Sequence, residues 1–252
     1  MAKSMKEIRL EFEKAGWEEY AMLFQVYADD ERAGVRQLIE KYRRKEEKLL
    51  LEKKRIRQMM RYEEEYAACQ YICGIDEVGR GPFAGPVVAG AVILPKGCEI
   101  LYVNDSKQLS AKKREELYDV IMEKAIAVGI GVSSPARIDE INILQATYEA
   151  MQKAVAELKT VPDLLLNDAV TIPGIEIPQV PIIKGDEKSI SIAAASIIAK
   201  VTRDRMMEEY DKLLPGYGFA ANKGYGSAEH IRALQKLGPS PIHRRSFVRK
   251  YI

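Results

Sequence analysis

Residues 71–94 read YICGIDEVGRGPFAGPVVAGAVIL, and the fold is organised around this stretch. Residues 71–78 are rich in β-branched and aromatic side chains, which predicts a strand that closes on the acidic pair Asp76 and Glu77. Residues 86–94 are apolar without alternation, as is typical of a buried strand. The two predicted strands are close enough along the chain to pair in an antiparallel manner.

Predicted strands alternate with predicted helices over the following residues. The expected strands cover 130–134, 164–170 and 181–186, and the expected helices cover about 110–127, 139–159 and 189–213. In the last of these helices, apolar residues recur with the period of 3.6 that is typical of packing on a sheet. Strands followed by helices indicate an α/β fold.

The first 70 residues have a different composition from the remainder. Charged side chains make up 31 of these 70 residues, and proline is absent. The formal charge is −4 over residues 1–31 and +7 over residues 36–61. A pattern rich in Glu, Lys, Arg and Leu predicts helix from Asp30 to Tyr66. We therefore expect a small helical module over 1–70. Its charged residues either contact nucleic acid or simply face the solvent.

The overall composition excludes several classes of protein. The 252 residues are 47% apolar with a formal net charge of +2, which allows a sizeable core. No apolar run approaches the roughly 18 residues of a membrane span, and the N-terminus is too charged for a signal peptide. Three cysteines without a C-x-x-C motif, and only two histidines, disfavour a disulfide framework and a structural zinc site. We expect a cytoplasmic protein.

Four acidic residues follow apolar runs at predicted strand ends: Asp76, Glu77, Asp168 and Asp186. If they meet at one rim of the sheet, their mutual repulsion requires a cation. Oxygen ligands without Cys or His select Mg²⁺ or Mn²⁺, and such a site can hold two ions about 3.5–4 Å apart. The alternative is that each acid serves a turn or a helix cap, which is the preferred interpretation for Asp186 taken alone.

A glycine-rich turn, Gly79-Arg80-Gly81-Pro82-Phe83-Ala84-Gly85, joins the first two predicted strands. It is not a dinucleotide fingerprint, because its third glycine is one position late and a strand follows it instead of a helix. Its glycines allow a close approach of the backbone to a ligand, and Arg80 can bind a phosphate. The alternative is an ordinary hairpin turn with a solvated arginine.

The stretch GIDEVGRGPFAGPVVAGAV strongly resembles the opening motif of the bacterial ribonuclease HII family, the type 2 ribonucleases H. Later segments agree with this family in the same order: 104–110, 164–170, 182–205, 216–230 and 238–247. The resemblance covers about residues 71–250 and implies a ribonuclease H-like fold, with a mixed five-stranded sheet flanked by helices and further helices at the C-terminus. Residues 1–70 are similar to the N-terminal extension of bacillus-type members.

The resemblance also implies an activity and roles for single residues. The activity is metal-dependent cleavage of RNA in RNA–DNA hybrids, and on the 5′ side of single ribonucleotides in duplex DNA, leaving 3′-hydroxyl and 5′-phosphate ends. The four acids would bind two Mn²⁺ or Mg²⁺ ions and catalyse the hydrolysis. The residues that would contact the substrate are Gly79, Arg80 and Gly81 at the 2′-hydroxyl, Tyr225 at the following deoxyribose, and Lys107, Lys184 and Lys200 at phosphates.

The C-terminal region carries its own signal for duplex binding. Residues 212–252 have a formal charge of +7, and the bases His243, Arg244 and Arg245 stand among aromatic residues. We expect this surface to contact phosphates, the alternative being a solvated basic tail. Two rival functions are a non-catalytic nucleic-acid-binding protein and a metal-dependent nuclease acting on ordinary DNA. A monomer is expected, and no protein partner is predicted.

Overall fold

The computed structural model describes residues 3–252, which form two compact units. One unit ends at Arg57 and the other runs from Gln58 to Ile252. Residues 58–70, which the sequence analysis grouped with the N-terminal module, therefore lie within the second unit. Within the described residues, none of the helices has the length and apolarity that crossing a membrane requires.

The N-terminal unit is helical, as expected, and has a core of its own. It consists of α1 (Met5–Lys14), a short 3₁₀ turn (Trp17–Glu19), α2 (Tyr20–Val26) and most of α3 (Ala33–Met59). Ser4 and Glu7 form a capping box that fixes the start of α1. The core residues are apolar side chains from all three α-helices: Ile8, Phe12, Tyr20, Leu23, Phe24, Tyr27, Val35, Leu38, Ile39 and Tyr42.

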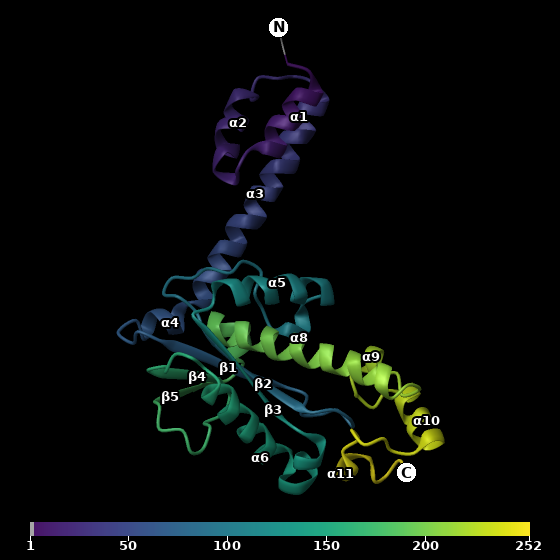
Figure 1. Cartoon of the computed structure of the whole chain (residues 1–252). Coiled ribbons are helices and arrows are strands. Elements are labelled where there is room, and N and C mark those ends of the chain that lie inside the picture. The colour runs from purple at the N-terminus through teal and green to yellow at the C-terminus, as the bar shows by residue number, and fades with distance from the viewer. Residues whose placement is uncertain (1–2) are drawn as a thin grey trace. The chain divides into compact units, whose positions relative to one another are not determined.

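The second unit is built on a mixed five-stranded sheet, which confirms the expected fold class (Figure 1). Its strands are β1 (Ile72–Val78), β2 (Val87–Ile93), β3 (Ala127–Ser133), β4 (Leu164–Asp168) and β5 (Gln179–Ile182). The strand order is β3-β2-β1-β4-β5. The first three strands pair antiparallel, whereas β4 runs parallel to both β1 and β5.

Helices cover both faces of this sheet. They are α4 (Arg61–Glu65), α5 (Ala111–Lys124), α6 (Pro135–Ala156), α7 (Gly185–Lys188), α8 (Ile190–Leu213), α9 (Phe219–Asn222), α10 (Ala228–Leu237) and α11 (Arg245–Val248). α6 packs on one face of the sheet, against β2 and β3. α8 packs on the opposite face, against β1 and β2 (Figure 1). Of the last three helices, α9 contacts α8, and α11 is bonded to α6 through the amides of Arg245 and Ser246, which donate to Asp139.

Glycines in the strands let these two helices approach the sheet closely. A Cβ atom on Gly90 would lie 2.5 Å from the carbonyl oxygen of Ala195 in α8. A Cβ atom on Gly131 would lie 1.8 Å from the carbonyl oxygen of Ala150 in α6. Both distances are far shorter than van der Waals contact, so only glycine fits. The close seating of α8 brings its polar residues next to the end of β1.

Several boundaries differ from the sequence-based expectation, among them the start of β3, which is Ala127 and not residue 130. The helix expected from residue 139 begins at Pro135, because the side chain of Ser134 caps it by accepting from the amide of Arg137 at 3.2 Å. The strand expected over 181–186 ends at Ile182, because Lys184 has a φ of +57° and starts the short helix α7. Asp186 therefore stands in the first turn of a helix and not in a strand.

Candidate active site

The four predicted acids come together at one edge of the sheet. Asp76 and Glu77 lie near the end of β1, and Asp168 ends β4. Because β1 and β4 are parallel, their carboxyl ends meet at the same edge. Asp186 joins them from α7, and a hydrogen bond from the amide of Gly185 to Oδ1 of Asp168, 2.7 Å long, ties α7 to β4.

These acids act on one another electrostatically. Burial raises the pKa of Asp76 well above its ordinary value of 3.8, and the negative charge of Glu77 raises it further. The charges of Asp168 and Asp186 add to this effect. Burial, followed by the charge of Asp168, also raises the pKa of Asp186 to about 6. Carboxylates that oppose each other's ionisation in this way form a strongly negative site.

The donor chemistry of this site suits a hard divalent cation. All four side chains offer carboxylate oxygens, which Mg²⁺ and Mn²⁺ prefer. Among residues 3–252, however, no three His, Cys, Asp or Glu side chains form a preformed cluster that could hold a metal ion. The charge and the ligand type of the four acids fit a divalent cation.

Lys107 and Asp105 belong to the same site. The Nζ atom of Lys107 lies 3.9 Å from Oδ2 of Asp186 and 3.8 Å from Oδ1 of Asp105. Burial lowers the pKa of Lys107, but the charges of Asp105, Asp76 and the neighbouring acids outweigh this and raise it. Asp105 was not predicted as a site residue. Its place directly before the Ser106-Lys107 pair was the available signal.

The other two candidate lysines have other partners. Lys200 donates to Oδ1 of Asp204 at 2.7 Å, and only 14% of its side chain is exposed. Burial lowers its pKa. The side chain of Lys184 is 68% exposed, with its Nζ atom 3.9 Å from Glu187. Of the three lysines, Lys107 is therefore the one whose ammonium group contacts a predicted acid.

A buried arginine holds the glycine-rich turn in place. Arg244 is fully buried, and its guanidinium donates to the carbonyl oxygens of Gly79 at 2.5 Å, Arg80 at 2.9 Å and Gly85 at 3.0 Å. Burial lowers its pKa to about 9, which leaves it charged at neutral pH. Since each carbonyl has its own donor, the backbone of the turn is fixed from its buried side.

A second buried arginine joins this turn to the loop that carries Tyr225. Arg203, which is also fully buried, donates to the carbonyl oxygens of Ala84 at 3.1 Å, Pro86 at 2.9 Å and Lys223 at 2.9 Å. A Cβ atom on Gly81 would lie 3.8 Å from the Tyr225 ring. The predicted substrate-contacting residues Arg80, Gly81 and Tyr225 are therefore exposed on neighbouring loops, whereas Gly79 is buried against Arg203 and Arg244.

The expectation that His243 and Arg244 contribute to a basic surface was wrong. Their exposed fractions are 2% and 0%, because both side chains point inward to polar groups of neighbouring loops. Arg245 is exposed. A run of basic residues is typical of a solvated surface. The sequence does not show that Arg244 instead donates to backbone carbonyl oxygens of a distant turn.

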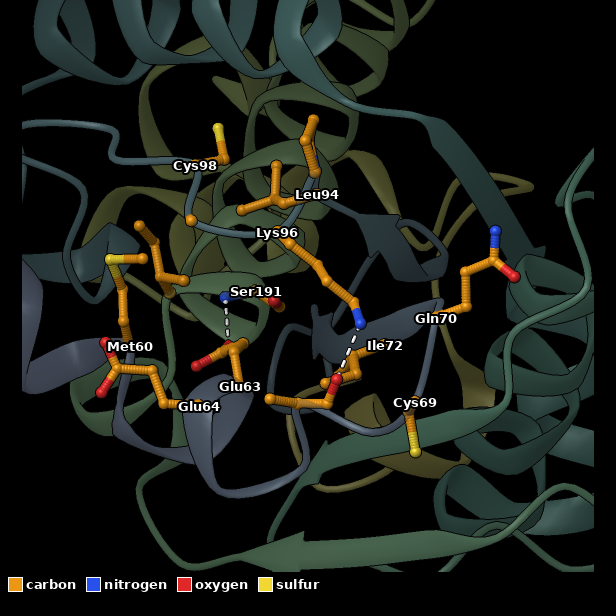
Figure 2. A pocket seen from close by; sticks show the side chains of 14 residues that line it. Met60, Glu63, Glu64, Cys69, Gln70, Ile72, Leu94, Lys96, Cys98 and Ser191 are labelled. Atoms are coloured by element: carbon orange, nitrogen blue, oxygen red, sulfur yellow. Dashed lines mark hydrogen bonds between the residues drawn. The ribbon is translucent and has the colours of Figure 1, made fainter.

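A cavity of about 130 Å³ lies elsewhere in the second unit, between α4, the loop after β2 and the start of α8 (Figure 2). As far as the described residues go, its lining contains none of the four acids. On one side of it, Oε1 of Glu63 accepts from the Ser189 hydroxyl at 2.6 Å and the Ser191 amide at 3.0 Å. Glu63 thus anchors α4 to the start of α8, which explains why residues 58–70 belong to this unit.

Comparisons with known proteins match both parts of the chain. A family model described as Ribonuclease HII matches residues 73–250, and one described as Ribonuclease HII N-terminal domain matches residues 4–67. A protein named Ribonuclease HII from Lachnoclostridium phytofermentans is 66% identical over 97% of this chain and 96% of its own length. Another from Clostridioides difficile is 50% identical over 99% of both chains.

Solved structures resemble the second unit. The ribonuclease H2 from Pyrococcus horikoshii superposes with a TM-score of 0.58 at 28% identity, over 72% of this chain and 96% of that one. The RNase HII of Archaeoglobus fulgidus, solved in a complex with PCNA, gives 0.57 at 28% identity, over 69% and 93%. A ribonuclease HIII (Bst-RNase HIII) solved with Mn²⁺ shares the fold, with a TM-score of 0.51 at 22% identity.

Proposed function

Because this chain belongs to the ribonuclease HII family, and so is a ribonuclease H that cuts RNA internally, we propose that it acts on RNA–DNA hybrids and on single ribonucleotides embedded in duplex DNA. Cleavage falls on the 5′ side of the ribonucleotide and leaves a 3′-hydroxyl and a 5′-phosphate. The observation that carries this proposal is the placement of four carboxylates at the same end of β1 as the turn that holds Arg80.

Divalent cations, Mn²⁺ or Mg²⁺, are the proposed cofactors. Asp76, Glu77, Asp168 and Asp186 would hold two of them, because their combined negative charge attracts cations and a bound cation relieves the repulsion among the carboxylates. When bound, such ions lower the pKa of a water molecule and stabilise the departing oxygen of a phosphodiester. Lys107, beside Asp186, offers a cation that can also bind a phosphate oxygen.

The turn and the tyrosine divide substrate recognition between them. Gly81 is exposed and lacks a side chain, so polar groups of the substrate can reach its backbone, whereas the missing side chain of buried Gly79 makes room for Arg203. A 2′-hydroxyl both donates and accepts hydrogen bonds, which a backbone amide and carbonyl can match. The Tyr225 ring, 46% exposed beside Gly81, offers a flat surface for the deoxyribose that follows the ribonucleotide. Lys184 and Lys200 are weaker candidates for phosphate contacts.

This assignment is tested by comparing three duplexes of the same sequence: an RNA–DNA hybrid, a DNA duplex with one ribonucleotide, and all-DNA. With Mg²⁺ or Mn²⁺, the first two should be cut and the third left intact. Cleavage of all three at similar rates would support a general nuclease instead. Binding of all three without cleavage would support a non-catalytic binding protein.

Changing Arg80 to alanine should weaken cleavage at a single ribonucleotide about tenfold, and general duplex binding by much less. The reason is that a charge-assisted hydrogen bond to the substrate contributes about 1.5–3 kcal/mol where it forms. The matched control is Arg205→Ala, because Arg205 is as exposed as Arg80, with 48% and 45% of their side chains accessible. Equal losses of cleavage and of binding in Arg80→Ala would contradict the recognition role.

Stabilisation by metal should depend on pH. A carboxyl whose pKa is raised on folding stabilises the fold while protonated, and this contribution is lost as the pH rises through the folded value, about 6 for Asp186. The metal-free protein should thus lose stability as the pH rises from about 4 to 7 at this site, and Mn²⁺ should restore it. We expect Mn²⁺ to raise the melting temperature more at pH 7.5 than at pH 5.5. An equal rise at both would contradict the metal site.

The N-terminal unit is proposed to increase affinity for the duplex. The +7 stretch over residues 36–61 includes exposed bases along α3, among them Arg43, Arg44 and Lys48. Bases that neutralise phosphates release counterions and make affinity dependent on salt. This unit has its own core, and residues 58–70 pack with the catalytic unit, so a deletion should stop at residue 57.

Deleting residues 1–57 should raise KM about tenfold at physiological salt, with little change in kcat. The dependence of log KM on log salt should also become shallower, since fewer phosphates are neutralised. In the full chain, changing Arg43, Arg44 and Lys48 together to glutamine should give part of the same effect. An unchanged KM in the deletion variant would favour a docking or stabilising role for this unit.

A further inference from the structure

The two histidines of the chain form a buried pair behind the Tyr225 loop. His230, in α10, and His243, in the segment after it, are 0% and 2% exposed, and their Nε2 atoms lie 3.0 Å apart. On the outer side of each ring, Nδ1 of His243 lies 2.9 Å from the amide of Ser240, and Nδ1 of His230 lies 2.8 Å from the carbonyl oxygen of Tyr225.

The hydrogen-bond direction along this chain follows from its two ends. The amide of Ser240 can only donate, and the Ser240 hydroxyl, 2.7 Å from the same atom, can donate as well, so Nδ1 of His243 accepts and its proton resides on Nε2. That proton is donated to Nε2 of His230, whose own proton must then reside on Nδ1. This nitrogen faces the carbonyl oxygen of Tyr225, which can only accept. The Tyr225 carbonyl thus requires this pair of tautomers, and the donating amide of Ser240 agrees with it.

The surroundings keep both rings neutral. Aromatic rings of Phe83, Tyr217 and Phe219 surround the pair, with centroids 5.0–6.5 Å from the imidazoles. Burial lowers the pKa of both histidines, to about 4 for His243. A proton added to Nε2 of His230 would set two N–H groups against each other across the 3.0 Å gap, and a proton added to Nδ1 of His243 would oppose the amide N–H of Ser240.

The relay is attached to the same turn that carries Arg80. Next to His243, the carbonyl oxygen of Ile242 accepts from the amide of Gly85 at 2.9 Å. The amide of Arg244 donates to the carbonyl oxygen of Phe83 at 2.8 Å. The segment 242–244 is therefore bonded to the turn through its backbone. Through His243 and then His230, it is also connected to the carbonyl of Tyr225.

We propose that His230 and His243 are positioning residues that set the height and orientation of Tyr225 relative to Gly81, and thereby determine how well the enzyme recognises the deoxyribose after a ribonucleotide. This inference rests on the proposed function of Tyr225 as the surface for that sugar. Neither histidine contacts the substrate, and each acts through the backbone carbonyl of the tyrosine.

The tautomers can be read directly by NMR on the full-length protein. Since the chain has only two histidines, a long-range ¹H–¹⁵N spectrum of uniformly ¹⁵N-labelled protein shows two imidazole patterns. At pH 7 we expect one ring protonated on Nδ1 and the other on Nε2. Two rings in the Nε2–H form, which free histidine prefers, would overturn the relay.

Two substitutions at His230 separate the relay from general packing. Leucine fills much of the volume but donates nothing, whereas asparagine places an amide N–H near the position of Nδ1 and can still donate to the Tyr225 carbonyl. We expect His230→Leu to lower kcat/KM about tenfold on a duplex with one ribonucleotide, and much less on an RNA–DNA hybrid, where the nucleotide after the cleaved ribonucleotide also carries a 2′-hydroxyl and no deoxyribose is available to Tyr225. His230→Asn should recover most of this loss.

A double-mutant cycle with Tyr225→Ala completes the test. If His230 acts through Tyr225, adding His230→Leu to Tyr225→Ala should cause little further loss on the single-ribonucleotide duplex. Met151→Ala is the control, because it creates a cavity in the core on the α6 side and should combine additively with Tyr225→Ala. Additive losses for His230→Leu would overturn the inference while leaving the proposed function intact. Absence of cleavage by the wild type would instead overturn the proposed function, and the NMR result would still report on the relay.

Discussion

Replacing Asp168 by asparagine should lower metal-dependent RNA cleavage about a thousandfold and leave the protein folded. Asparagine keeps a side-chain oxygen, so the hydrogen bond from the Gly185 amide, 2.7 Å long, can persist. The substitution removes one of the four negative charges that attract a cation to this site. A thousandfold loss corresponds to about 4 kcal/mol, within the range that a bound metal contributes to a transition state.

The same substitution should stabilise the metal-free protein. The charge of Asp168 raises the pKa of Asp76 and of Asp186, so its removal relieves repulsion among buried carboxylates. We expect a higher melting temperature for Asp168→Asn than for wild type at pH 7.5 in the presence of a chelator. Asp119→Asn makes the same change on an exposed part of α5 and is the control. It should alter neither the rate of RNA cleavage nor the melting temperature of the metal-free protein. Retained activity, or a lower melting temperature of the metal-free variant, would contradict this account.

Replacing Arg244 by methionine should cost about 3 kcal/mol or more of unfolding free energy. The guanidinium serves three carbonyl oxygens, those of Gly79, Arg80 and Gly85. Each buried carbonyl left without a donor costs about 1–3 kcal/mol, and the relief of burying one charge offsets only part of the total. Chemical denaturation of the full-length protein measures this change.

Activity should separate the roles of this arginine further. Without Arg244, the carbonyl oxygens of Gly79, Arg80 and Gly85 lose their hydrogen-bond donor, and the turn becomes less well fixed. The ratio of cleavage at a ribonucleotide to cleavage of all-DNA should therefore fall, even where the protein remains folded. Arg244→Lys keeps the charge but cannot reach all three carbonyls, so it should recover only part of the stability. Arg245→Met removes the neighbouring exposed arginine and should be close to neutral. Similar stability losses in Arg244→Met and Arg245→Met would refute the structural role of Arg244.

The sequence is most informative where local pattern and tertiary structure agree. The two strands of residues 71–94 and the alternation after them predicted the mixed sheet, because buried strands and amphipathic helices carry periods that do not depend on distant residues. The position of Asp76 and Asp168 at the carboxyl ends of neighbouring strands follows from the same pattern. The resemblance to ribonuclease HII implied the five strands of the sheet, and the strand order β3-β2-β1-β4-β5 comes from the structure alone.

Other features depend on contacts between distant segments. Arg244 and His243 stand in a basic run that is typical of a surface, and only the fold shows that carbonyl oxygens more than 150 residues away bind Arg244. Asp105 directly precedes Ser106 and Lys107, but only the fold shows that Asp186 of α7 lies beside it. Lys200 and Asp204 are four residues apart in α8, so their ion pair is a local contact. The contact between Lys107 and Asp186 joins distant segments, and only the fold shows that this lysine lies next to the acids.

The most direct test of the central claim is the position and chemistry of the cut in a DNA duplex that holds one ribonucleotide. With Mn²⁺ or Mg²⁺, the wild type should produce one nick on the 5′ side of that ribonucleotide. The upstream product should end in a 3′-hydroxyl and the downstream product should begin with a 5′-phosphate, both read by gel mobility and mass spectrometry. A nick on the 3′ side, a 2′,3′-cyclic phosphate end, or equal cleavage of the all-DNA duplex would contradict the proposed function.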